Sequence, residues 1–163
     1  MKRLLIVWHS RTGTSEAMAM VAARSASLQG ALVVRTIRAE VGSTEDLLQA
    51  DGYIFAGPEN LGGLSGEMKA FLDRTYYGAL EQLNGRPYAH LIAAGSDGSG
   101  AARQLSRIVT GWRLRVVADP TILVTGAQTP EAILAPKYPT EADLAPAREL
   151  GAAMAAGLTM GVF

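Results

Sequence analysis

The residues of this chain whose types and spacing best suit binding chemistry lie close together near its start. Four hydroxyl side chains and one glycine occupy six positions, Ser10-Arg11-Thr12-Gly13-Thr14-Ser15. An apolar run at 4–8 precedes this stretch and apolar residues at helical spacing follow it, which predicts a loop from a buried strand into a helix. The first N–H groups of that helix have no intrahelical partner, and the helix dipole adds partial positive charge there. Together with the hydroxyl groups they predict a binding site for a phosphate.

A helix N-cap is the structural alternative, because serine and threonine are also the residues that most often cap helices. One cap needs only one such residue and four are present, so phosphate binding is the favoured interpretation. The stretch has no lysine and a single glycine. This excludes the lysine-containing loop of nucleoside triphosphatases and the glycine-rich fingerprint of dinucleotide-binding folds. Neutral donors of this kind suit a terminal phosphate monoester held without a metal.

Two further stretches contain glycines that let a backbone approach a ligand closely, Gly57–Gly63 and Gly95–Gly100. Each follows a predicted buried strand, as the 10–15 stretch does. In parallel sheets, ligands bind beyond the carboxyl ends of the strands. The three stretches are therefore predicted to meet at one edge of a sheet and to form a single site.

Apolar runs alternate with helical stretches along the whole chain, which predicts a parallel sheet with helices on both faces. The runs are continuous rather than alternating, as expected for strands buried on both faces. The predicted strands are 3–8, 31–37, 52–56, 88–94 and 113–117, the last resuming at 121–124. The predicted helices are 14–28, 44–49, one starting near 66, 100–110 and 141–157. Residues 126–139 contain three prolines and are predicted to be a surface connection.

The three stretches resemble the flavin-binding loops of the flavodoxin-like family. Ser10-x-Thr12-Gly13-x-Ser15 is similar to that family's loop for the phosphate of FMN. Residues 56–74, which end in Met-Lys-Ala-Phe-Leu-Asp-Arg, resemble the second flavin loop and following helix of the NAD(P)H:quinone reductase and NADPH-dependent FMN reductase branch. Residues 94–100 stand where the third loop belongs. The resemblance extends from residue 3 to about 157. It implies one flavodoxin-like domain over 1–163, a three-layer α/β sandwich with a five-stranded parallel sheet in the order 2-1-3-4-5.

On this resemblance the protein is an oxidoreductase that binds FMN. It implies NADH or NADPH as the reductant, and a quinone, a similar small molecule or a redox partner protein as the electron acceptor. The flavin carries out the redox step, so neither a catalytic side chain nor a metal ligand is expected. The expected cofactor-binding residues are Ser10, Arg11, Thr12, Gly13, Thr14, Ser15, Pro58, Glu59, Asn60, Leu61, Gly62, Gly63, Gly95, Ser96, Asp97, Gly98 and Gly100. A one-electron carrier of the flavodoxin type and a flavin-free binding module on the same fold stay open as alternatives.

The second stretch departs from its family in one respect. Family members often carry aromatic residues there, whereas this chain has Glu59, Asn60 and Leu61. We therefore expect one face of the flavin to be open to substrate, which favours the reductase over the carrier. The alternative is that Leu61 and Leu64 pack beneath the loop. His9 and Asp97 could contact the cofactor or could serve only as a loop residue and a turn residue.

The composition excludes several other classes of protein. The chain has 15 basic and 15 acidic residues, so its net charge of zero suits neither nucleic-acid binding nor the markedly acidic electron carriers. It has no cysteine and only two histidines, which argues against a thiolate or histidine metal site. No Ser–His–Asp set or carboxylate pair is spaced for hydrolysis. Neither a signal peptide nor a membrane span is predicted, so a cytoplasmic protein is expected, and a homo-oligomer is compatible with it.

Overall fold

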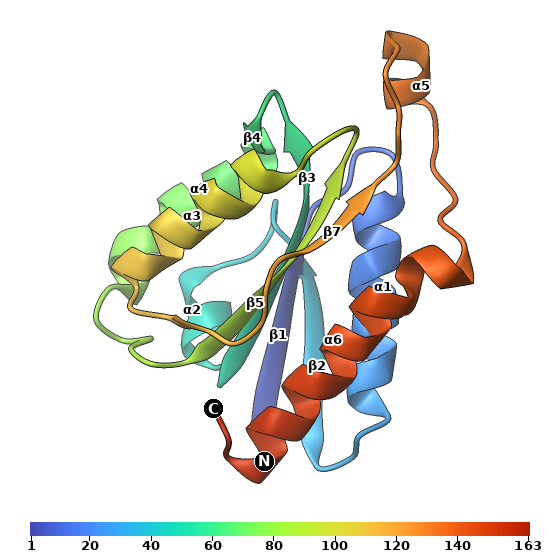
Figure 1. Ribbon diagram of the computed structural model, residues 1–163. Helices are drawn as coiled ribbons and strands as arrows, with labels where there is room; N and C mark the ends of the chain where they lie inside the picture. Colours follow the sequence, from blue (N-terminus) through green and yellow to red (C-terminus); the bar gives the residue numbers. More distant parts are fainter.

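The computed structural model describes residues 1–163, which form three layers around a mainly parallel sheet (Figure 1). Two helices cover one face of the sheet, α1 (Thr14–Ser27) and α6 (Glu141–Met160). The other face is covered by α2 (Thr44–Leu48), α3 (Gly66–Ala79) and α4 (Ser99–Gly111). The short helix α5 (Pro130–Leu134) stands away from both layers, at the top of Figure 1. No helix combines the length and the apolar character needed to cross a membrane.

The sheet has the strand order that the sequence predicts. Its main strands run in the order β2 (Leu32–Arg38), β1 (Lys2–Trp8), β3 (Gly52–Asn60) and β5 (Pro87–Ala94). Two short strands then pair with β5, namely β6 (Arg115–Val116) and β7 (Thr121–Val124). These two are the predicted fifth strand, interrupted around Pro120, which has no N–H group for the ladder. A two-residue strand, β4 (Gly63–Leu64), pairs antiparallel with β3 and brings the total to seven rather than five.

Successive side chains of β1 point to opposite faces of the sheet. Leu5 and Val7 point into the core beneath α2, α3 and α4, while Leu4 and Ile6 point into the core beneath α1 and α6. All four side chains are at most 1% exposed. Because β1 is apolar on both faces, it can only lie in the middle of the sheet. Its carboxyl end, which leads into the hydroxyl-rich loop, is thereby fixed at the centre of one sheet edge.

The helices differ from the predicted ones mainly at the end of α6 and by the presence of α5. α6 continues past Gly157 to Met160 and ends at Gly161, whose positive φ of 68° is the usual left-handed helix ending. Residues 126–139 were expected to lack a helix but contain α5, whose N-cap Thr129 accepts a hydrogen bond from the Ala132 N–H. The Thr129-Pro130 pair is a recognisable helix start, since proline suits the first helical position. None of the residues of α5 is buried, so no apolar periodicity marks it.

Candidate functional site

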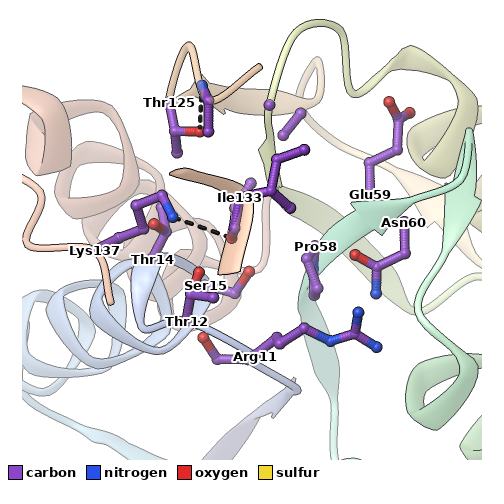
Figure 2. A pocket seen from close by; sticks show the side chains of 15 residues that line it. Arg11, Thr12, Thr14, Ser15, Pro58, Glu59, Asn60, Thr125, Ile133 and Lys137 are labelled. Atoms are coloured by element: carbon purple, nitrogen blue, oxygen red, sulfur yellow. Dashed lines mark hydrogen bonds between the residues drawn. The ribbon is translucent and has the colours of Figure 1, made fainter. Parts of the chain in front are cut away.

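The three predicted loops meet at the carboxyl edge of the sheet and line an open cavity there (Figure 2). The cavity is lined by Ser10, Arg11, Thr12, Thr14, Ser15, Pro58, Glu59, Asn60, Ala93, Ala94, Gly95, Thr125, Ala127, Ile133 and Lys137. Nine of these were predicted from the sequence, and all three loops contribute. Parallel strands bring them together because β1, β3 and β5 are adjacent and end at the same edge.

The 10–15 loop does not behave as an ordinary helix cap. Gly13 occupies the N-cap position of α1, and no side chain accepts a hydrogen bond from the first turn of that helix. Ser10 instead accepts a hydrogen bond from the Gly13 N–H at 3.0 Å, which folds the loop back on itself. The N-terminal N–H groups of α1 therefore remain without a side-chain partner, so the structure rules out the helix-cap alternative.

Two hydroxyl groups in this loop are buried without a hydrogen-bond partner. Thr14 is 3% exposed and Ser15 is 1% exposed, and neither Oγ1 of Thr14 nor Oγ of Ser15 has a partner. An unsatisfied buried polar group costs about 1–3 kcal/mol. Both residues line the cavity at the start of a helix, where the dipole favours an anion. A phosphate placed there would accept hydrogen bonds from both hydroxyls and would remove this cost.

Both the backbone conformation at position 13 and the atoms around it require a glycine there. Its φ of +111° is one that residues with a side chain rarely adopt. A Cβ atom at this position would lie 3.0 Å from the carbonyl oxygen of Lys137, which belongs to the segment that follows α5. The 10–15 loop and residue 137 are thus packed against each other directly, backbone on backbone.

The second loop is a tight hairpin between β3 and β4. Glu59 pairs with Leu64 and Asn60 with Gly63, and the two-residue turn has positive φ at both Leu61 (52°) and Gly62 (77°). Such a turn matches the twist of the strands but strains a leucine by about 1–2 kcal/mol. Leu61 is fully exposed, so the interpretation that Leu61 and Leu64 pack beneath the loop is wrong for Leu61.

Two other residues of the hairpin, Leu64 and Asn60, point inward. Leu64 is buried against the core beneath α3 and α4. Asn60 lines the cavity, and its side-chain Nδ2 is buried without a hydrogen-bond partner. The amide N–H groups of Asn60 are consequently available to a carbonyl group of a bound ligand.

Glu59 connects the second loop to the third. One carboxylate oxygen accepts a hydrogen bond from the Gly98 N–H and the other accepts one from the Ala101 N–H, each at 3.0 Å. The carboxylate therefore caps α4, whose N-cap residue, Gly98, has a positive φ of 91° and no cap from its own loop. This contact holds the two loops in a fixed relation on the same side of the cavity.

Several predicted residues lie outside the cavity lining, namely Gly13, Leu61, Gly62, Gly63, Ser96, Asp97, Gly98 and Gly100. Asp97 is a surface turn residue: its carboxylate accepts a hydrogen bond from Ser99, which holds the pKa of Asp97 below its usual value. His9 lies outside as well. Its Nδ1 is 2.9 Å from the Ser65 hydroxyl and its Nε2 is 3.5 Å from Glu67, as expected for a satisfied loop histidine.

The segment after β7 contributes four lining residues that the sequence did not reveal: Thr125, Ala127, Ile133 and Lys137. The surface connection predicted for 126–139 is therefore also a wall of the site. Its contact with the first loop is a hydrogen bond of 2.7 Å from the Lys137 N–H to the Thr12 carbonyl. Nothing in the local sequence signals this contact, because it joins residues that are 125 positions apart.

Residues 40–129, which span the second and third loops, match the family model described as NADPH-dependent FMN reductase. The chain belongs to this family of FMN-binding, flavodoxin-like oxidoreductases. The predicted resemblance to the flavodoxin-like FMN-binding family is thereby confirmed. The unsatisfied hydroxyls of Thr14 and Ser15 fit the phosphate of the cofactor that the family binds.

Individual relatives agree with this assignment. The chain is 32% identical over 101 residues to a flavodoxin of Aquifex aeolicus (strain VF5), a match that covers 61% of this chain and about half of that protein, 54%. A flavodoxin from the domain Archaea has a TM-score of 0.79 at 17% identity, covering 96% of this chain and 99% of the archaeal one. A rubredoxin oxygen:oxidoreductase of Desulfovibrio gigas has a TM-score of 0.78 at 17% identity, covering 99% of this chain and 37% of that enzyme. At such identities the two structures show the flavodoxin-like fold.

Proposed function

We propose that residues 1–163 act as one FMN-binding domain that takes electrons from NADH or NADPH and passes them to a quinone or a similar small acceptor. The observation that carries the cofactor assignment is the pair of buried, unpartnered hydroxyls of Thr14 and Ser15 at the start of α1. Ser10 and Thr12, which line the same wall, are the further hydroxyl residues that would hold the phosphate. When bound, FMN supplies the ring that accepts and returns the electrons.

The other walls of the cavity would hold the remainder of the cofactor. Pro58 and Asn60 come from the second loop and Gly95 from the third, and all three line the cavity. The buried amide of Asn60 suits a ring carbonyl, and glycine at 95 lets the backbone come close. Because the Glu59 carboxylate already joins the two loops, little ordering is needed on binding, and pre-organisation of this kind favours affinity.

The hairpin tip supports a reductase. Leu61 is fully exposed and lies outside the cavity lining, and no aromatic side chain stands at the tip, so no large side chain at the tip of this loop covers the cavity. A two-electron reductase must admit nicotinamide and acceptor in turn, which an open site allows. The identity to a flavodoxin favours the second candidate, a one-electron carrier. The net charge of zero speaks for the reductase, since carriers find their partners through charge.

A cationic cleft beside the hairpin suits the phosphates of a nicotinamide dinucleotide. It lies between α3 and α4 and is lined by Gly62 of the hairpin, Lys69, Arg103 and Arg107, among others. Arg103 and Arg107 are four residues apart on α4 and therefore project from the same face. Arginine is well suited to phosphate because its guanidinium group offers a planar set of donors.

The proposal is tested by titrating the protein with FMN and following the quenching of flavin fluorescence. The loaded protein is then mixed with NADH or NADPH and a small quinone, and nicotinamide oxidation is followed by absorbance. We expect FMN binding and steady oxidation. Failure to bind FMN would refute the flavoprotein assignment, whereas FMN binding without oxidation of either nucleotide would favour the carrier.

A further inference from the structure

The phosphate site, as predicted from the sequence, has a single charged side chain to match its ligand. A phosphate monoester carries about −1.5 to −2 at pH 7. The hydroxyl and N–H donors of the 10–15 loop are neutral, and the one charged residue of that loop is Arg11. In Figure 2 the guanidinium of Arg11 is directed toward the side of the cavity that carries Pro58 and Asn60, away from Thr14 and Ser15. Arg11 is also exposed to solvent, which weakens its effect on an ion at the start of α1.

Lys137 is the other cationic residue in the lining, and it lies on the phosphate side. Its N–H donates to the Thr12 carbonyl at 2.7 Å, and its carbonyl packs against Gly13. Figure 2 shows its side chain on the same side of the cavity as Thr14, with the ammonium group turned toward Ile133. Lys137 is only partly exposed, so its charge is less screened than that of Arg11.

The ammonium group of Lys137 is fixed by the end of α5. It donates to the carbonyl oxygens of Ala132 and Ala135, each at 2.6 Å, and to that of Ile133 at 3.2 Å. The last carbonyls of a helix have no intrahelical partner and attract a cation. Immobilising a free lysine side chain costs up to about 2 kcal/mol of rotamer entropy. Here these contacts order the side chain before any ligand binds. They occupy all three N–H groups of the ammonium, so Lys137 would act on the phosphate through its charge, from the α5 side of the cavity, and not through a hydrogen bond.

We propose that Lys137 supplies the positive charge that balances the phosphate of the cofactor, so that this charge comes from the segment 126–139 and not from the 10–15 loop. The inference rests on the proposed binding of FMN. It makes this segment, which the sequence presents as a surface connection, part of the recognition of the phosphate. It also separates two tasks: the first loop supplies directional donors, and Lys137 supplies the charge.

The test compares FMN with riboflavin, which has the same ring and no phosphate. The ratio of the two dissociation constants measures recognition of the phosphate alone. We expect Lys137→Gln to lower the preference for FMN at least tenfold, to leave riboflavin affinity unchanged, and to reduce the salt dependence of FMN binding. Lys137→Arg should keep most of the preference because it keeps the charge. Since no residue of α5 is buried, these variants are expected to fold, and thermal unfolding checks it.

Arg11→Gln is the matched control, because it removes the other charge of the lining. A loss of preference in Arg11→Gln but not in Lys137→Gln would overturn the inference. So would an equal loss of FMN and riboflavin affinity in Lys137→Gln, since that is the result of a merely structural role. Equal affinity of the unaltered protein for FMN and riboflavin would instead overturn the phosphate site itself, so the two failures can be told apart.

Discussion

Replacing the two buried hydroxyls should change ligand binding and stability in opposite directions. In the free protein, the hydroxyl groups of Thr14 and Ser15 are buried and unpartnered, each at a cost of about 1–3 kcal/mol. Thr14→Val keeps the shape of the side chain and removes this polar group, so the free energy of unfolding of the free protein should rise by about 1 kcal/mol. A hydrogen bond to a charged phosphate is worth about 1.5–3 kcal/mol. FMN affinity should therefore fall roughly 10- to 150-fold. Ser15→Ala should behave in the same way.

Two measurements check this pair of effects. Urea unfolding of the flavin-free protein gives the change in stability, and fluorescence titration gives the FMN and riboflavin dissociation constants. Riboflavin affinity should stay constant, because these hydroxyls are proposed to contact the phosphate, which riboflavin lacks. Thr159→Val is the control: its hydroxyl donates to the Ala155 carbonyl at 2.8 Å on α6, far from the loop in sequence, and FMN affinity should not change. If Thr14→Val bound FMN as tightly as the unaltered protein, the hydroxyl would not be a phosphate donor and the reasoning would fail.

Further outcomes follow from single features of the structure. Gly13→Val should abolish FMN binding in titrations while circular dichroism shows a folded chain, since its Cβ would press on the Lys137 carbonyl 3.0 Å away. Leu61→Trp should cover the open face of the site and lower kcat for nicotinamide oxidation more than it weakens FMN binding. The double variant Arg103→Gln with Arg107→Gln should raise the KM for NADPH without changing FMN affinity. His90 is a buried residue of β5, and burial lowers its pKa to about 4. Between pH 6.5 and 4 the unfolded chain therefore binds a proton at His90 that the folded chain does not. Unfolding free energy should therefore fall by up to about 3 kcal/mol as pH drops through this window, and His90→Gln should lack this component in urea titrations at several pH values.

The arrangement of the sheet was predictable because it follows from local patterns. Continuous apolar runs such as Leu4–Val7 mark strands that are buried on both faces, and helical stretches between them require parallel crossovers. The interruption of the last strand near Pro120 was also visible, because proline cannot donate to a ladder. The helix α5 was not predicted, because it lacks a local apolar pattern of this kind. It buries no residue, so it has no apolar face for the sequence to show.

The first loop shows how much of a site a sequence can specify. Glycine at 13 and the hydroxyls at 14 and 15 depend on their own backbone and on the helix that they begin, so their proposed role can be inferred from six consecutive residues. The predictions for the other two loops were coarser. Their glycines identified the right edge of the sheet, but they did not show that Leu61 would be exposed or that the Glu59 carboxylate would turn to α4.

The sequence by itself determined the sheet, the edge at which the site lies and the hydroxyl-rich cradle, because each depends on residues that are close together in the chain. Only the tertiary structure decided which side chains face the cavity. Glu59 reaches the Gly98 N–H across 39 positions, and the backbone of Lys137 reaches Thr12 across 125. Contacts of this kind are set by the packing of whole elements against one another. No local propensity encodes them, and so the place of Lys137 beside the proposed phosphate site became visible only once the chain was folded.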